Sequence, residues 1–354
     1  MRIVCAMSGG VDSSVAAALL QAQGHEVVGL TMRLYDAGVG HGQRRGGSCC
    51  SPAEVDLARD VCAQLGLPHY VVDERERFAQ AVIEPFADDY AAGRTPNPCT
   101  RCNQHVKFAP LLARVRALGF DALATGHYAR NQGGALLRAV DASKDQSYFL
   151  FAMGPDALAH TQFPLGTWTK AEVRAHAATL GLPNADAPDS QELCFVPGDD
   201  HGEVVAARLQ ARAQDLAALG PGDVVDVAGT VVGRHDGIHR VTVGQRRGLH
   251  LGGGDRRYVL RVIPSSRTIV VGSASEASVS RVRVAELQRL ALPDGRHRFD
   301  VQLRHRAAAT PAWVEVDGAL ATVELDTPVH GVAPGQAAVF YDGARVRGGG
   351  WITA

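Results

Sequence analysis

The first 24 residues constrain the fold most, because an apolar strand, a glycine turn and a helix follow one another there. RIVCAM, residues 2–7, is typical of a buried strand, and DSSVAAALLQAQG, residues 12–24, is typical of a helix that ends at a glycine. Between them MSGGVDSS, residues 7–14, combines two glycines with three serines and an aspartate. Glycine lets a backbone approach a ligand closely, and a helix N-terminus offers free N–H groups to an anion. The segment predicts a phosphate-binding loop after the first strand.

This loop differs from the two commonest nucleotide loops, since it contains neither the GxxxxGK pattern nor the GxGxxG pattern. It resembles the SGGxDSS signature of the ATP pyrophosphatase superfamily. The resemblance implies cleavage of ATP between its α and β phosphates and adenylation of a carbonyl oxygen, which a nucleophile then attacks. Asp12 is placed to hold a Mg²⁺ ion against a pyrophosphate.

Strand and helix patterns alternate through the first half of the chain, in residues 25–35, 51–66, 69–73, 76–93, 107–119 and 121–128. This alternation predicts an α/β fold with a doubly wound parallel sheet. From about residue 220, short Val-rich runs lie between glycines and predict β-rich structure. We expect a catalytic ATP pyrophosphatase domain over residues 1–200, a small central β-rich domain over 201–275 and a C-terminal β-barrel over 276–354.

The composition predicts a cytoplasmic protein without a membrane span. No run of 18 apolar residues occurs, and the N-terminus has the pattern of neither a secretory signal nor a transit peptide. Thiols stay reduced in the cytoplasm, so the seven cysteines indicate catalysis, metal binding or burial rather than structural disulfides. Cys5 and Cys62 fall on apolar positions and are expected to be buried. The net charge of −1 is the sum of −5 in residues 1–200 and +4 in residues 201–354. The arginines of the second half either bind phosphates of a partner or simply form a solvated surface.

PNPCTRCN, residues 96–103, contains two cysteines, Cys99 and Cys102, with two residues between them. A structural zinc site needs four ligands, but no second CxxC occurs, and the adjacent Cys49 and Cys50 are a poor chelating pair. A nucleophilic thiol that pairs with a distant thiol fits better, and Cys194 in DSQELCF is a candidate partner.

Eight motifs together identify the family that the chain resembles. MSGGVDSS, GRTPNPCTRCNQHVKF, ATGHYAR, SKDQSYFL, PLGTWTKAEVRAHAATLGLP, DSQELCF, TVGQRRGL and PGQAAVFY occur in the order seen in tRNA-specific 2-thiouridylases. The match spans nearly the whole chain. The resemblance implies an enzyme that replaces the 2-oxygen of a wobble uridine in tRNA anticodons with sulfur. It also implies that the C-terminal barrel contacts tRNA.

The resemblance also implies a role for individual residues. Cys102 is the expected nucleophile and Cys194 the carrier of a persulfide sulfur that a donor protein supplies, and the two would end each cycle as a disulfide. The expected ATP-binding residues are Ala6, Met7, Ser8, Gly9, Gly10, Val11, Asp12, Ser13, Met32 and Gly126. The expected tRNA-contacting residues are Asn97, Pro98, Cys99, His127, Lys144, Asp145, Gln146, Arg304, His305 and Gln336.

Cys99 departs from the family pattern, because the best-known bacterial members carry an aspartate three residues before the nucleophile. A thiol is a weaker match to the acid/base role of that carboxylate. The substitution also places a third cysteine near Cys102 and Cys194, and three thiolates are able to ligate an iron–sulfur cluster. Cys99 is therefore a candidate acid/base, a candidate cluster ligand or neither.

Several of these residues also have a structural interpretation. Lys144 and Asp145 also fit an exposed ion pair, Arg304 and His305 a solvated strand, and Gln336 a turn cap. Two other functions remain open as well. An amide-forming ATP pyrophosphatase would not need Cys102 and Cys194, and a non-catalytic tRNA-binding protein would not convert ATP to AMP.

Overall fold

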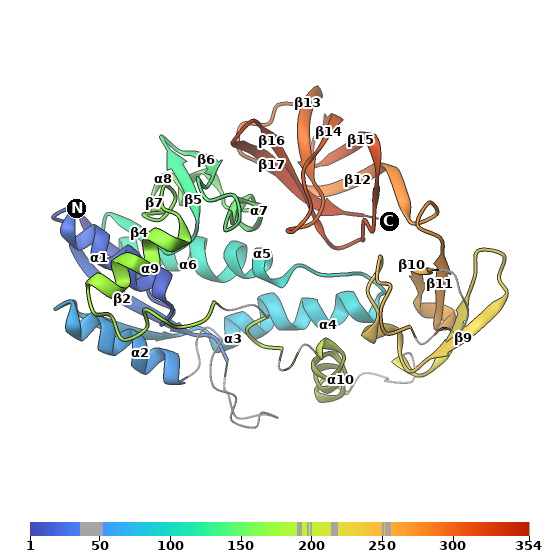
Figure 1. The fold of residues 1–354 in the computed structure, drawn as a ribbon, viewed down its shortest axis with the longest axis horizontal. Coiled ribbons are helices and arrows are strands. Elements are labelled where there is room, and N and C mark those ends of the chain that lie inside the picture. The colour runs from blue at the N-terminus through green and yellow to red at the C-terminus, as the bar shows by residue number, and fades with distance from the viewer. Residues whose placement is uncertain are drawn as a thin grey trace. The chain divides into compact units, whose positions relative to one another are not determined.

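The computed structural model in Figure 1 describes residues 1–35, 52–189, 193–196, 198, 200–213, 219–249, 251 and 256–353. Cys49 and Cys50 lie outside the described residues. The chain divides into two compact units. The first comprises Met1–Val82, Cys99–Asp199 and Ala344–Val346, and the second comprises Ile83–Pro98, Asp200–Gly343 and Arg347–Ala354.

A five-stranded parallel sheet forms the centre of the first unit, with the order β3-β2-β1-β4-β7. Its strands are β1 (Arg2–Ala6), β2 (Glu26–Arg33), β3 (His69–Asp73), β4 (Ala122–Thr125) and β7 (Thr161–Gln162). The order reverses between β1 and β4, because the chain first builds outward from β1 to one side and then returns to the other. In sheets of this kind ligands bind at the carboxyl ends of the strands beside such a reversal.

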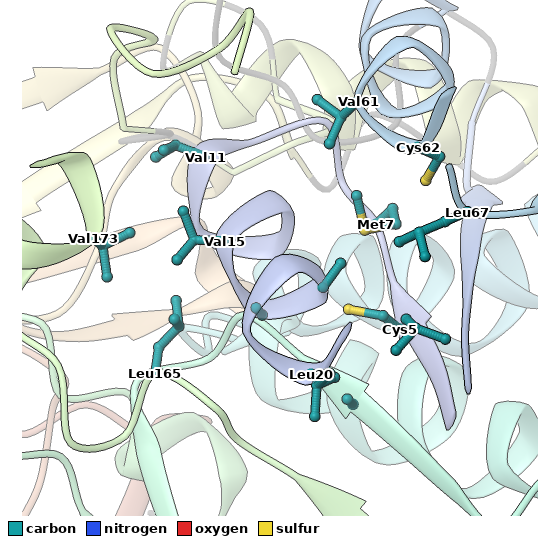
Figure 2. Close-up of a cluster of buried hydrophobic side chains, with 14 of the residues drawn as sticks. Cys5, Met7, Val11, Val15, Leu20, Val61, Cys62, Leu67, Leu165 and Val173 are labelled. Carbon is teal, nitrogen blue, oxygen red and sulfur yellow. The ribbon is translucent and has the colours of Figure 1, made fainter. Parts of the chain in front are cut away.

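Helices α1 (Val11–Ala22), α2 (Pro52–Gln64) and α9 (Lys170–Thr179) share a buried apolar cluster with the sheet. Figure 2 shows Val15 of α1 facing Val173 of α9, while Met7, which directly follows β1, lies toward Cys62 of α2. Cys5 and Cys62 are fully buried, as the sequence predicts. The other elements of this unit are α3 (Arg75–Phe78), α6 (Ala109–Ala117), α7 (Ser147–Leu150), α8 (Pro155–Ala159), β5 (Ala129–Gln132) and β6 (Ala135–Arg138), and α5 (Pro98–Cys102) begins at the unit boundary.

Two π-helical segments lie between consecutive α-helices, and the first falls within residues 76–93, which the sequence pattern predicts as one helix. Ala79–Ile83 separates α3 from α4 (Glu84–Ala91), and Asn103–Phe108 separates α5 from α6. Both α4 and α6 carry a proline at their second residue, Pro85 and Pro110. Proline has no N–H to donate to the preceding turn, which accounts for the wider turn before it.

The second unit is rich in strands, and its β-rich part begins after α10 (His201–Ala211). One sheet has the order β10-β11-β8-β9, with β8 (Gly222–Val225), β9 (Val231–His235), β10 (Tyr258–Ile263) and β11 (Thr268–Gly272). Six further strands follow, namely β12 (Ser278–Arg289), β13 (Gly295–Gln302), β14 (Thr310–Asp317), β15 (Leu320–His330), β16 (Ala337–Asp342) and β17 (Arg345–Ile352). Pairing of β12 with β17 closes them into a barrel.

Alternating burial explains why this last part forms a barrel. Along β14, the side chains of Ala312, Val314 and Val316 are buried, while their neighbours Trp313 and Glu315 are exposed. This period of two gives each strand one apolar face for the barrel interior. The predicted fold class, a doubly wound parallel sheet followed by β-rich parts with a C-terminal barrel, is confirmed. No helix among the described residues is long and apolar enough to span a bilayer.

Candidate active site

The glycine loop connects β1 to α1 at the carboxyl end of the sheet. Gly9 has a φ of +79°, and a Cβ there would lie 2.5 Å from the carbonyl oxygen of Glu54. Gly126, which follows β4, has no room for a side chain either, because a Cβ would lie 2.7 Å from the carbonyl carbon of Asp12 and the nitrogen of Ser13. Both glycines are therefore required by close backbone packing around the loop.

Serine and asparagine side chains hold the loop in one conformation. The Ser13 hydroxyl accepts a hydrogen bond from the Ser8 nitrogen at 3.2 Å and donates one to the Gly10 carbonyl at 2.9 Å. Asn184 donates from Nδ2 to the Gly9 carbonyl at 2.7 Å and to the Ser14 hydroxyl at 2.8 Å. A loop fixed in this way, at the N-terminus of a 12-residue helix, is ready to bind phosphate without reorganising.

Asp12, in the first turn of α1, is the charged centre of the site. Lys170 donates from Nζ to the two carboxylate oxygens of Asp12 at 2.7 and 2.9 Å, and the Tyr128 hydroxyl donates to it at 2.8 Å. Burial raises the pKa of the Tyr128 hydroxyl, and the negative charge of Asp12 raises it further. Tyr128 is therefore neutral at physiological pH and acts as a hydrogen-bond donor.

A second carboxylate, Asp189, extends this network. It contacts Lys170 at 2.8 Å, Lys144 at 2.7 Å and Arg174 at 3.0 Å. Burial alone would raise the pKa of Asp189, but the hydrogen bonds and charges of Lys144 and Lys170 outweigh it and lower that pKa to about 2. Asp189 is therefore an anion over the whole physiological range.

The remaining predicted ATP-binding residues lie on β1, β2 and the loop. Ala6 is the last residue of β1, Met7 follows it with 2% exposure, and Met32 is buried near the end of β2. Val11 begins α1 and is buried. Met7, Val11 and Met32 are therefore packed in the interior and offer little surface to a ligand in this structure.

All three candidate thiols belong to the first unit. Cys99 and Cys102 lie on α5, where Cys99 is exposed and Cys102 is only 6% exposed. Cys102 directly precedes the π-helical segment, whose first residue, Asn103, donates from Nδ2 to the Phe149 carbonyl at 3.1 Å. Cys194 is half-buried in a turn, and the neighbouring Phe195 ring packs edge-on against Phe78 at 5.7 Å.

The predicted tRNA-contacting residues of the first unit differ in how many hydrogen bonds their side chains make within the chain and in how exposed they are. Asp145 is 7% exposed and binds Arg138, the Ala139 nitrogen and the Ser147 hydroxyl. Gln146 exchanges hydrogen bonds with the backbone of Tyr128, at 2.9 Å through its side chain and 2.8 Å through its nitrogen. Both residues fix the segment in place, whereas the Lys144 side chain keeps 34% exposure.

His127 lies between the loop-packing residue Gly126 and Tyr128. Its Nδ1 is 2.9 Å from the Thr125 hydroxyl, and its ring lies 5.8 Å from that of Phe108 and 6.4 Å from that of Phe163. The His127 ring is half-buried and contacts Thr125, Phe108 and Phe163, so its orientation is fixed before any ligand binds to it.

The second unit carries the other predicted tRNA-contacting residues. Gln336 donates from Nε2 to the Thr95 and Pro96 carbonyls at 3.1 and 3.0 Å, so it holds the backbone that precedes Asn97 and Pro98. Asn97 is 6% exposed, and Pro98 is buried. Arg304 and His305 are exposed after β13, and Gln302 donates from Nε2 to both of their carbonyls, at 3.2 and 2.7 Å.

A metal site built from side chains alone is not present in the part of the chain that the structure describes. No three His, Cys, Asp or Glu side chains gather there in an arrangement that would hold a metal ion, and Cys99, Cys102 and Cys194 are among the residues searched. An iron–sulfur cluster at Cys99, Cys102 and Cys194 stays a prediction. A single carboxylate beside a phosphate loop, as at Asp12, does suit Mg²⁺, which usually takes one or two carboxylates together with substrate phosphates.

Sequence reasoning missed Lys170, Tyr128, Asp189 and Asn184 as site residues. Lys170 had a usable signal, because the chain has only three lysines, and all three, Lys107, Lys144 and Lys170, lie in the quoted motifs. An open hollow of about 510 Å³, lined by Leu20 and Gln23 among others, lies at the opposite end of α1 from the loop. None of the predicted site residues lines it.

A parallel sheet with a phosphate loop at its reversal point, a carboxylate and a lysine defines a nucleotide-binding α/β domain. Three family models match the chain. Their descriptions are tRNA methyl transferase HUP domain over residues 1–198, tRNA methyl transferase PRC-barrel domain over 213–273 and aminomethyltransferase beta-barrel domain over 281–352.

Curated relatives match over the full length. The tRNA-specific 2-thiouridylase MnmA of Rhodospirillum centenum is 50% identical, with 99% of this chain and 91% of the relative covered. The proteins of the same name from Acidothermus cellulolyticus and Zymomonas mobilis are 49% and 47% identical, with 99% of this chain and 97% and 93% of the relatives covered. The chain belongs to the family of tRNA-specific 2-thiouridylases, which confirms the family that its motifs indicate.

Proposed function

We propose that this chain catalyses the ATP-dependent 2-thiolation of the wobble uridine in tRNA. The observation that carries the proposal is that the phosphate loop, the Asp12–Lys170 pair and the thiols Cys102 and Cys194 all belong to one compact unit. An ATP-splitting enzyme that formed amides would have no use for the two thiols. Full-length similarity to enzymes named tRNA-specific 2-thiouridylases supports the same reaction.

The first step is adenylation of the base. The 2-oxygen of uracil attacks the α-phosphorus of ATP, and pyrophosphate leaves. The N–H groups at the start of α1 and the hydroxyls of Ser8 and Ser13 would bind the phosphates. Asp12 would hold Mg²⁺, which neutralises the leaving pyrophosphate when bound. Lys170, whose Nζ lies within 3 Å of Asp12 in this structure, would contact that pyrophosphate.

The second step moves sulfur. The terminal sulfur of a Cys194 persulfide attacks C2 of the adenylated uridine, and AMP leaves with the former 2-oxygen. The Cys102 thiolate then attacks the sulfur of Cys194, which forms a Cys102–Cys194 disulfide and releases 2-thiouridine. A persulfide-carrying donor protein would load Cys194, and a thiol reductant would reopen the disulfide. Cys99, which is exposed beside Cys102 on α5, would serve as the acid/base in place of the aspartate of other members.

Recognition of tRNA would involve both units. In the first unit, His127 and Lys144 would contact the anticodon region, while Asp145 and Gln146 hold the Lys144 segment. In the second unit, Asn97 and Pro98 would approach the base, and Arg304 and His305 would contact the RNA backbone from the barrel. Gln336 would act by holding residues 95–96. We propose residues 1–200, 201–275 and 276–354 as the functional domains, and the cytoplasm, where tRNA is modified, as the location.

The deciding experiment gives the protein unmodified tRNA, ATP, Mg²⁺ and a persulfide donor, followed by digestion and mass spectrometry of the nucleosides. We expect a uridine in which sulfur replaces oxygen, and we expect it to disappear in Cys194→Ser and Cys102→Ser. Cys62→Ala is the matched control, since it removes a buried thiol whose pKa burial raises to about 11. If both serine variants still form AMP and the modified base, thiol chemistry is not the mechanism. If the wild type forms no AMP with tRNA, the chain is only a tRNA-binding protein.

A further inference from the structure

Asp189 lies at the junction of two parts of the site. One oxygen, Oδ2, is 2.7 Å from Nζ of Lys144, and the other, Oδ1, is 2.8 Å from Nζ of Lys170. Lys144 belongs to the segment proposed to contact tRNA, whereas Lys170 binds Asp12 of the phosphate loop. A chain of four alternating charges therefore connects the two substrates' sites.

The position of Lys170 indicates that the network has more than a packing role. Lys170 is the first residue of α9, where the helix dipole disfavours a positive charge. It is nevertheless only 12% exposed, and its ammonium contacts both Asp12 and Asp189. Arg174, one turn later on the same helix, contacts Asp189 and donates to the Ala187 carbonyl at 3.0 Å, which anchors the Asp189 segment to α9.

We propose that Asp189 is a positioning residue that couples tRNA binding at Lys144 to the binding of ATP·Mg²⁺ at Asp12, through Lys170. The inference rests on the proposed function, because it takes ATP and tRNA as the two ligands. It adds a residue and a direction of coupling to that function.

The sign of the coupling follows from competition for one carboxylate. Without tRNA, Lys144, Lys170 and Arg174 share the negative charge of Asp189, and Lys170 also neutralises Asp12. When a tRNA phosphate binds Lys144, Asp189 interacts more strongly with Lys170 and draws it away from Asp12. The freed carboxylate of Asp12 is then available to Mg²⁺. Binding of tRNA therefore tightens binding of ATP·Mg²⁺, and linkage requires the reverse as well.

Two substitutions distinguish coupling through Asp189, which we call the relay, from simple attraction between Lys144 and the triphosphate. Lys144→Gln removes the competitor for Asp189 and should tighten ATP·Mg²⁺ binding in the absence of tRNA. If Lys144 only added positive charge near the triphosphate, the same substitution would weaken that binding. In an Asp189→Asn background, Lys144→Gln should have no effect, because the shared carboxylate charge is gone.

The experiment measures the dissociation constant of α,β-methylene-ATP with Mg²⁺ by calorimetry, with and without an unmodified tRNA that the wild type thiolates. We expect tRNA to tighten binding of the analogue about fivefold in the wild type. The effect should vanish in Asp189→Asn, and Lys144→Gln alone should reproduce it without tRNA. Glu74→Gln is the control, since Glu74 is also a buried carboxylate between two arginines, Arg77 and Arg114, in the same unit.

The outcomes distinguish this inference from the proposed function. If Lys144→Gln weakens analogue binding or leaves it unchanged, the relay is wrong even where the wild type thiolates tRNA. Coupling that persists in Asp189→Asn, or that Glu74→Gln also abolishes, overturns the role of Asp189 as well. A wild type that binds neither ligand refutes the proposed function and this inference together.

Discussion

The Nζ atom of Lys170 lies 2.7 and 2.9 Å from the two carboxylate oxygens of Asp12, although 158 residues separate them in the chain. A parallel sheet makes this approach possible, since the helices that follow β1 and β7 pack side by side as α1 and α9. The pair places a cation beside the phosphate loop, where a leaving pyrophosphate would develop charge in the proposed reaction.

Replacing Lys170 should therefore impair the adenylation step. A hydrogen bond to a charged group contributes about 1.5–3 kcal/mol, so Lys170→Met should lower kcat/KM for ATP by roughly 10- to 100-fold. The measurement is tRNA-dependent AMP formation at varied ATP. Arg59→Met, which removes an exposed cation paired with Asp56 in the same unit, should change the rate little. Equal losses in the two variants would contradict a specific role for Lys170.

Substitution of Gly126 should impair ATP binding as strongly as a substitution in the phosphate loop itself. A methyl group there would overlap backbone atoms of Asp12 and Ser13 at 2.7 Å, so Gly126→Ala must displace the start of α1. We expect KM for ATP to rise at least about tenfold, because a shift of about 1 Å in a positioning element costs up to 100-fold. Gly154→Ala is the matched control, since a Cβ at Gly154 meets nothing within 4 Å. Unchanged ATP kinetics in Gly126→Ala would mean that the loop tolerates the displacement.

The fold and the loop follow from short-range patterns in the sequence. Apolar runs of strand length alternate with helical periodicity, and the glycines of residues 9–10 stand where the first strand ends. The two π-helical segments could also have been predicted from the sequence, because Pro85 and Pro110 each remove a backbone hydrogen-bond donor at a known position. The sequence patterns did not single them out, since the apolar period continues across both prolines.

The partners inside the site could not be predicted in the same way. Asp145 and Gln146 stand in a motif associated with tRNA, yet their side chains bind Arg138 and the backbone of Tyr128. Which carboxylate meets which lysine depends on how loops from β1, β4 and β7 converge, and spacing along the chain does not encode that. Asn184 illustrates the limit, because its bond to the Gly9 carbonyl spans 175 residues.

The thiols should differ sharply in reactivity. Burial raises the pKa of Cys5 to about 12, with a further contribution from Cys62, and burial raises the pKa of Cys62 to about 11. Only the thiolate reacts with iodoacetamide, so both should remain unlabelled in the folded protein at pH 8, while Cys99, which is exposed, should be labelled first among the cysteines that the structure describes. Peptide mass mapping after brief alkylation is the test. Early labelling of Cys5 would show that the sheet opens beneath the loop.

The second unit should lose stability in mild acid because of His239. This side chain is 5% exposed, and its burial, with the positive charges of Arg240, His201 and His235, lowers its pKa to about 4, against a smaller opposing effect of Asp200. Between pH 6.5 and about 4 the unfolded chain binds a proton that the folded chain does not. Stability therefore falls as the pH falls through this window, by about 3 kcal/mol in total.

Replacing His239 by glutamine should flatten that dependence. The expected result is a melting temperature that declines less between pH 6.5 and pH 4 than in the wild type, as followed by circular dichroism. The comparison is of slopes rather than absolute values, because the substitution also changes packing at every pH. Parallel slopes in the two proteins would show that other groups cause the acid sensitivity.

Arg304 should contribute to tRNA affinity through phosphate rather than through base recognition. It is exposed after β13, and the Gln302 side chain donates to its backbone carbonyl at 3.2 Å, so the turn that carries Arg304 is held in place. Arg304→Ala should weaken binding of different tRNAs to a similar extent and lower the slope of log K against log salt by about 1. Filter binding at several salt concentrations measures both quantities. Arg281→Ala is the matched control on the same barrel, because its guanidinium already pairs with Glu324 at 3.0 Å. A slope that does not change in Arg304→Ala would place the phosphate contact elsewhere on the barrel.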